Sequence, residues 1–120
     1  MMELPPYAAM LGLRMEGAVV RMPFAGHLVG SPGLLHGGSI AGLLEIAANM
    51  AVAAAVEEDV ALKPIGVTVE YMRGGAHADV LAEAKIMRLG RRIANVRVEA
   101  WQEERDKPIA AAWVNLMLER

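Results

Sequence analysis

The sequence predicts an α+β fold in which one long apolar helix packs against an antiparallel β-sheet. A continuous apolar segment from Ile40 to Val56 carries a single charged residue, Glu45, which indicates a buried helix. Short alternating segments precede it, and longer alternating segments follow it to the C-terminus. Short strands, one helix and long strands, in this order, are typical of a sheet with a helix on one face.

The N-terminal half is expected to contain two short strands, a long loop and the helix. Residues 13–24 predict the two strands, with Gly17 near the turn between them. Residues 25–38 are rich in glycine and predict an irregular loop of the kind that often carries function. The helix should begin near Ser39 and end around the acidic run at 57–59.

The C-terminal half predicts a meander of three or four long antiparallel strands that begins after Pro64. No internal repeat, low-complexity tract or interdomain linker is visible, so residues 1–120 are expected to form one domain. The expected strands are residues 65–72, 78–89, 92–103 and 108–118.

Composition argues against several classes of function. The net charge of −2 favours neither nucleic acid nor an anionic membrane surface as a partner. Cysteine is absent, which excludes disulfides and thiolate chemistry, and three histidines without cysteine predict no metal site. The N-terminal segment, with Glu3 as an early acidic residue, does not resemble a secretory signal, so we expect a cytoplasmic protein.

The apolar segment is nearly long enough to span a bilayer. Glu45 and Asn49 within it, and the dominance of alanine over leucine, favour a helix in a protein core instead, with no membrane involved. A single sheet covers only one side of a helix. Because this helix is apolar on every side, we expect a second copy of the chain to cover it and form a homodimer.

Glu45 is the first candidate functional residue. A buried, unpaired carboxylate is costly unless it is hydrogen-bonded or takes up a proton. Asn49 lies one helical turn further along on the same face and could be its neighbour. The simplest alternative is that Glu45 only pairs with Asn49, or reaches solvent at the edge of an interface.

The second candidate is the sequence His36-Gly37-Gly38-Ser39, where the loop becomes the helix. Backbone N–H groups are free at a helix N-terminus, the helix dipole favours negative charge there, and glycine lets another group come close. Such a site can hold an oxyanion, although a plain loop-to-helix turn would use the same residues. Gly37 and Glu45 are about 12 Å apart along a helix axis, so they can act on one carbonyl only if Gly37 of one subunit faces Glu45 of another.

These residues resemble those of the hotdog-fold acyl-CoA thioesterases, and most of all the phenylacetate-pathway and 4-hydroxybenzoyl-CoA branches. The resemblance rests on the HGG loop, on an acidic residue nine positions after His36 and on the strands that follow, and it extends over about residues 12–118. It implies a hotdog fold, dimers that usually pair into tetramers, and active sites at subunit interfaces. It also implies hydrolysis of medium-chain or aryl-acyl-CoA with no cofactor, coenzyme A being part of the substrate.

The resemblance assigns a role to each residue of the candidate site. Gly37 corresponds to the oxyanion-hole glycine, with Gly38 beside it against the substrate. Glu45 corresponds to the catalytic carboxylate, which is either a general base for water or a nucleophile. His36 is expected to orient the loop or contact the thioester. One branch of the family has Thr four residues after the carboxylate, where this chain has Asn49, which could hydrogen-bond a water molecule or Glu45.

One departure from the family keeps other functions open. The family often has Asn or Gln six residues before the histidine, where this chain has Gly30. A non-catalytic acyl-CoA or acyl-carrier binding protein is therefore an alternative. A hotdog dehydratase, in which a loop histidine pairs with a helix glutamate, is a second one, with His27 as the histidine.

Arginines near the ends of the predicted strands are candidates for holding the phosphates of coenzyme A, because Arg makes bidentate phosphate contacts. They are Arg73 and the pair Arg91 and Arg92, of which Arg91, in a Gly-Arg turn, is preferred. Phe24 and Tyr71 could contact the acyl group.

Overall fold

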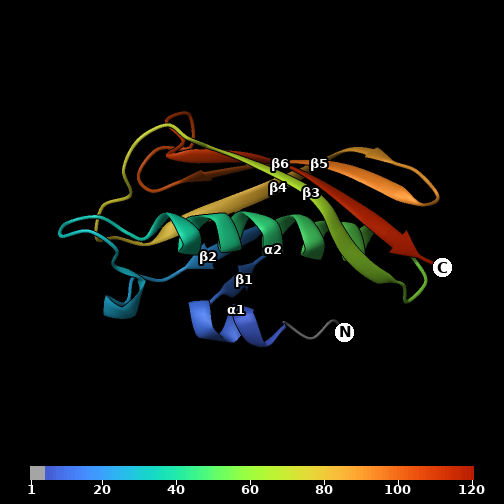
Figure 1. Cartoon of the computed structure of the whole chain (residues 1–120), viewed down its shortest axis with the longest axis horizontal. Helices are drawn as coiled ribbons and strands as arrows, with labels where there is room; N and C mark the ends of the chain where they lie inside the picture. Colours follow the sequence, from blue (N-terminus) through green and yellow to red (C-terminus); the bar gives the residue numbers. More distant parts are fainter. Residues whose placement is uncertain (1–4) are drawn as a thin grey trace.

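The computed structural model describes residues 5–120; residues 1–4, including Glu3, lie outside the described range. It has one antiparallel sheet with a long helix across its face and a short helix near the N-terminus (Figure 1). The elements in chain order are α1 (Pro6–Leu11), β1 (Arg14–Glu16), β2 (Val19–Met22), the 3₁₀ turn η1 (Gly26–Leu28), α2 (Gly37–Ala55), β3 (Ala61–Tyr71), β4 (Val80–Leu89), β5 (Ile93–Trp101) and β6 (Ala110–Glu119).

The strand order is β1-β2-β4-β5-β6-β3, and all neighbouring strands are antiparallel. β4, β5 and β6 form the expected meander, whereas β3 pairs with the far side of β6 and is an edge strand. The prediction that this strand starts after Pro64 is wrong, because β3 starts at Ala61. Pro64 is tolerated since β3 is at the edge and its register shifts between Pro64 and Gly66.

The inner face of the sheet is lined by small and β-branched side chains. Alternate residues of β5 and β6 point towards α2, as expected for strands with one buried face. Because many of these residues are alanines, the helix can pack closely against the sheet. Fully buried residues include Ala94, Val96, Val98, Ala100, Ala110, Ala112, Val114 and Leu116 on β5 and β6, and Leu43, Leu44, Ala48 and Val52 on α2.

The short helix α1 packs on the side of α2 that faces away from the sheet (Figure 1). The contact is close at Gly42, where an added Cβ would lie 2.7 Å from Cε2 of Tyr7 and 3.1 Å from Cδ1 of Leu11. The sequence did not predict α1, since six residues are too few to show a helical period. Part of the outer surface of α2 is therefore covered by the chain itself.

An antiparallel sheet wrapped around one long helix is the hotdog fold, and this confirms the predicted fold. By length and composition alone, α2 is long and apolar enough to cross a membrane. However, 50% of its apolar stretch is buried inside the fold. This is the pattern of a core helix, as the sequence predicted.

Candidate active site

The N-terminus of α2 presents one free backbone donor. His36 is the N-cap, and its Nδ1 accepts a hydrogen bond of 2.9 Å from the N–H of Gly38. The next two N–H groups, of Ser39 and Ile40, donate to the carbonyl oxygen of His36. Within residues 5–120, the N–H of Gly37 has no hydrogen-bond acceptor. It therefore lies free at the positive end of a 19-residue helix.

Two glycines make room for His36. A Cβ on Gly38 would lie 2.9 Å from Nδ1 of His36, and a Cβ on Gly30 would lie 3.0 Å from its Cα. Neither glycine has the left-handed backbone that glycine favours, so contact with His36 is the reason for the missing side chains. The departure from the family at Gly30 thus has a local cause, because a longer residue there would press on the His36 backbone.

Gly37, unlike Gly30 and Gly38, faces Tyr71 and not His36. A Cβ on Gly37 would lie 3.4 Å from the Tyr71 ring, which is an ordinary contact, and the backbone of Gly37 is not left-handed. Neither a clash nor the backbone conformation requires glycine here. The missing side chain leaves the free N–H without a methyl group beside it, with the Tyr71 ring as its neighbour on that side, so a ligand can approach the backbone closely.

Glu45 and Asn49 lie together with Ala41 on a half-buried stripe of α2. The sheet covers one side of the helix and α1 covers another, at Gly42, so this stripe is left between them. Glu45 is half-buried in the single chain, so its expected burial depends on a second copy covering this stripe. Among the described residues, Glu45 has no hydrogen bond or ion pair, and the expected pairing with Asn49 is not formed. Two turns of helix, about 12 Å, separate it from Gly37.

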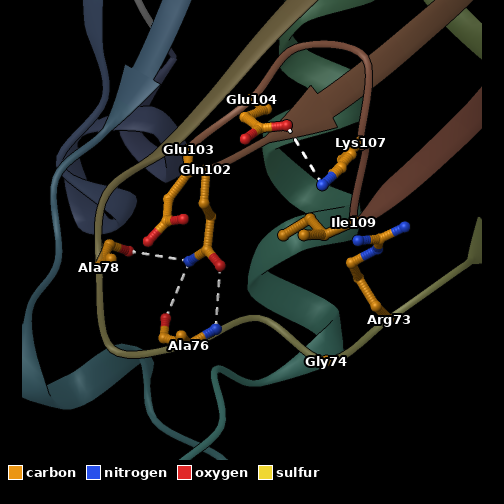
Figure 2. A pocket seen from close by; sticks show the side chains of 9 residues that line it. All are labelled: Arg73, Gly74, Ala76, Ala78, Gln102, Glu103, Glu104, Lys107 and Ile109. Carbon is orange, nitrogen blue, oxygen red and sulfur yellow. Dashed lines mark hydrogen bonds and ion pairs between the residues drawn. The ribbon is translucent and has the colours of Figure 1, made fainter.

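The predicted phosphate-binding arginines lie at opposite ends of the molecule. Arg73 follows β3 near the start of α2 and lines a hollow of about 340 Å³ with Lys107 and Gln102 (Figure 2). Arg91 and Arg92 occupy the turn between β4 and β5, at the end of the sheet that is remote from Gly37. Their carbonyl oxygens accept hydrogen bonds of 2.7 Å, from Arg120 Nε and from the N–H of Leu118 respectively.

His27 contacts α1. Its Nε2 lies 2.8 Å from the carbonyl oxygen of Met10, the last residue but one of that helix. A dehydratase would need this imidazole beside Glu45, and the structure shows no hydrogen bond between the two. No group of three or more His, Asp or Glu that could hold a metal occurs in the described part of the chain.

Tyr71 belongs to the site in a way that the sequence did not reveal. Its hydroxyl donates a hydrogen bond of 2.8 Å to the carbonyl oxygen of Gly37. The sequence suggested only an acyl contact for this residue. Its real neighbour depends on β3 ending beside the start of α2, and no local pattern reports that arrangement.

A family model described as "Thioesterase superfamily" matches residues 32–109, which include the whole of α2 and its N-terminal loop from Pro32 onwards. The chain belongs to the thioesterase superfamily. Membership supports thioester hydrolysis as the class of reaction. A comparison with curated proteins gave no match.

Solved structures similar to this thioesterase superfamily member share its whole fold. A phenylacetic acid degradation-related protein from Ralstonia eutropha JMP134 is 22% identical over 97% of this chain and 92% of its own, with a TM-score of 0.85. A conserved protein from Pseudomonas aeruginosa is 26% identical over 95% and 94%, with a TM-score of 0.84. A Bacillus halodurans protein solved with CoA is 18% identical over 93% and 74%, also with a TM-score of 0.84.

Proposed function

We propose that the protein is a homodimeric acyl-CoA thioesterase whose active site is shared between two subunits. The N–H of Gly37 on one protomer binds the thioester carbonyl, and Glu45 of the other protomer supplies the base or the nucleophile. The observation that carries this proposal is the pair of unsatisfied groups on α2. Within residues 5–120, the N–H of Gly37 and the carboxylate of Glu45 have no hydrogen-bond partner, and they lie too far apart to meet within one chain.

The edge strand β3 supports the dimer. It leaves one backbone edge unpaired and exposes two large apolar side chains, Ile65 and Val67, which are 52% and 41% exposed. Such an edge is suited to pairing with another strand. A two-fold axis beside β3 would reverse the direction of α2 in the second copy. The Gly37 end of one helix would then approach Glu45 of the other, and the Glu45 stripe would be covered.

The chemistry follows from charge development at the carbonyl. As water or Glu45 attacks the carbonyl carbon, negative charge builds on the oxygen, and a preformed N–H donor at that position is typically worth about 3 kcal/mol. With Glu45 as general base, it takes a proton from the attacking water; with Glu45 as nucleophile, it forms an anhydride that water then opens. The tetrahedral intermediate collapses by breaking the C–S bond, and the thiolate of coenzyme A leaves.

His36 and Asn49 assist in this proposal. Because Nδ1 of His36 accepts from Gly38, the proton of the neutral imidazole is on Nε2, which can donate to the thioester region. Asn49 lies one turn beyond Glu45 on the same stripe and can hydrogen-bond its carboxylate or the attacking water. Gly38 lies against the substrate beside the donor.

The two-fold axis also gives the arginines a role. Reversing one chain places its Arg91–Arg92 turn beyond the Gly37 end of the other chain. The nucleotide phosphates of coenzyme A would then meet Arg91 and Arg92 of one subunit, with Arg73 available from the subunit that supplies Gly37. Arg gives the bidentate phosphate contacts that such a site needs.

The proposal also covers the substrate class and the assembly. We expect a medium-chain or aryl-acyl-CoA, no metal or separate cofactor, and a cytoplasmic location. The phenylacetic acid degradation-related and CoA-bound structures are consistent with this substrate class. A second pairing into a dimer of dimers could use the outer face of the sheet, where Ile93 and Trp113 are 40% and 42% exposed.

Release of free thiol from a panel of acyl-CoAs tests the proposed function. The wild type is expected to hydrolyse at least one aryl or medium-chain member, and Glu45→Gln and Glu45→Ala are expected to lose that activity while remaining folded. Tight binding by the wild type without hydrolysis would instead establish an acyl-CoA or acyl-carrier binding protein. The absent side chain at Gly30 is the observation that favours this second candidate.

A further inference from the structure

The peptide between Gly37 and Gly38 is held at both ends. Its carbonyl oxygen accepts the hydrogen bond of 2.8 Å from the Tyr71 hydroxyl, and its N–H donates the hydrogen bond of 2.9 Å to Nδ1 of His36. The preceding peptide carries the free N–H of Gly37. The two peptides are joined at the Cα of Gly37, so the orientation of the held peptide limits that of the free donor.

This restraint matters because the joint is a glycine. The N–H of Gly37 lies in the plane of the His36–Gly37 peptide, whose carbonyl oxygen accepts hydrogen bonds from the N–H groups of Ser39 and Ile40 and from the Ser39 hydroxyl. Glycine has the widest choice of backbone angles, so the angle between this peptide and the next one depends on neighbouring contacts. The Tyr71 ring supplies such contacts. Its Cζ and hydroxyl oxygen lie 3.4 Å from the position of a Cβ on Gly37, so the ring covers the open side of the residue. A donor stabilises an oxyanion only when it is aimed before the reaction starts.

The backbone of Tyr71, which is 53% exposed as a residue, is fixed by the sheet. Tyr71 is the last residue of β3 and pairs with Ala110 of β6. Immediately after it, the N–H groups of Met72 and Arg73 both donate to the carbonyl oxygen of Ile109, at 2.9 and 3.2 Å. The hydroxyl is therefore carried by the sheet, which is the rigid part of the fold.

The segment after Tyr71 adds a second brace to the same loop. The carbonyl oxygen of Gly75 accepts a hydrogen bond of 2.9 Å from the N–H of Leu35, one residue before His36. Gln102 anchors this segment, since its amide exchanges hydrogen bonds of 3.0 and 2.9 Å with the backbone of Ala76 (Figure 2). The sheet thus holds the loop on both sides of the donor.

We propose that Tyr71 is a positioning residue that aims the Gly37 N–H at the substrate carbonyl. The inference rests on the proposed function, because it assigns Tyr71 a part in the oxyanion site described there. Within the described residues, the hydrogen bond of the hydroxyl goes to the Gly37 carbonyl oxygen. Tyr71 therefore acts through the peptide and not as an acid, a base or a nucleophile.

Tyr71→Phe tests this inference, because it removes the hydroxyl and keeps the ring over Gly37. The expected result is a kcat that falls about tenfold, with KM within about twofold and the melting temperature unchanged. The Gly37 and Gly38 amide signals in a ¹H–¹⁵N spectrum should shift, and exchange of the Gly38 N–H with solvent should become faster. Tyr7→Phe is the matched control; this tyrosine packs on Gly42 and should leave all of these values unchanged.

Three outcomes would overturn the inference. A kcat equal to that of the wild type would do so, as would unshifted Gly37 and Gly38 amides. A kcat loss matched by an equal loss in stability would show a structural role only. If the wild type hydrolyses no thioester, the proposed function fails, while the amide shifts and exchange rates still decide whether Tyr71 positions the Gly37 peptide. Tyr71→Leu, which also removes the ring, should give a larger amide change in the same direction.

Discussion

The imidazole of His36 folds back over the start of its own helix, where Nδ1 accepts a hydrogen bond of 2.9 Å from the N–H of Gly38. This contact satisfies one of the donors that every helix N-terminus leaves open and leaves the neighbouring Gly37 N–H free. It needs glycine at position 38, where a Cβ would lie 2.9 Å from Nδ1. The His36-Gly37-Gly38 sequence thus caps α2 and leaves the N–H of Gly37 available to a ligand.

Replacing His36 should separate its capping role from its chemical role. His36→Ala removes the acceptor and should lower the free energy of unfolding by about 1 kcal/mol, the typical value for losing an N-cap side chain. His36→Asn keeps an acceptor and should stay close to the wild type in stability. Urea unfolding measures this difference. The rate of thioester hydrolysis by His36→Asn then reports what the imidazole Nε2–H contributes to catalysis. Equal free energies of unfolding for His36→Ala and His36→Asn would contradict the capping role.

Gly37→Ala should fold normally and be inactive. The added methyl group makes only an ordinary contact with Tyr71, so stability should not change, but it occupies the space beside the free N–H. We expect a loss of about 100-fold in kcat/KM, comparable to the loss of one oxyanion donor. Gly26→Ala is the matched control, since no atom lies within 4 Å of its added Cβ. A fully active Gly37→Ala variant would show that the substrate does not approach Gly37 closely.

The arginine turn should matter only for substrates that carry the nucleotide. Arg91→Ala is expected to raise KM for the best acyl-CoA about fivefold, equivalent to about 1 kcal/mol. KM for the matching N-acetylcysteamine thioester, which lacks the phosphates, should not change. Arg105→Ala, at an exposed arginine paired with Glu83, is the control. Equal effects on both substrates would show that Arg91 does not bind phosphate.

Asp79 should make stability depend on pH in the acid range. The N–H of Phe24 donates to it at 2.8 Å and Arg21 adds an ion pair at 3.1 Å, which hold the pKa of the Asp79 carboxyl below its ordinary value. Because the folded pKa is the lower one, Asp79 stabilises the fold above its unfolded pKa and loses this effect as pH falls through the folded pKa.

Urea unfolding from neutral to strongly acidic pH measures this effect. Asp79→Asn should cost stability at neutral pH, and its deficit relative to the wild type should shrink as the solution becomes acidic. Asp106→Asn, at an exposed turn residue, should show no such trend. A deficit that stays constant with pH would mean that the charge of Asp79 contributes nothing.

The sequence was sufficient to predict elements whose pattern is local. The apolar run predicted α2, and the alternation of Val96, Val98 and Ala100 predicted β5, because each period reflects one buried face. The position of β3 beside β6 could not be predicted in this way. It depends on a connection from β3 to β4 that passes β6 and β5. Pro64 suggested a strand boundary, but an edge strand tolerates proline at this position.

The candidate site divides in the same manner. His36, Gly37 and Gly38 are adjacent in the chain, so their meeting at a helix start could be predicted from the sequence. Tyr71 lies beside Gly37 because the sheet topology places the end of β3 next to the start of α2, and the sequence does not predict this contact. The half-open stripe of α2 around Glu45 could not be predicted, because hydropathy alone does not reveal which part of the helix α1 and the sheet leave uncovered.

Mixing two inactive variants tests the shared active site most directly. Gly37→Ala and Glu45→Gln chains, unfolded together and refolded at equal amounts, should recover about one quarter of the wild-type activity per chain, because half of the dimers are mixed and each has one intact site. Each variant refolded alone should stay inactive. A mixture as inactive as its components would show that Gly37 and Glu45 do not meet across a subunit interface.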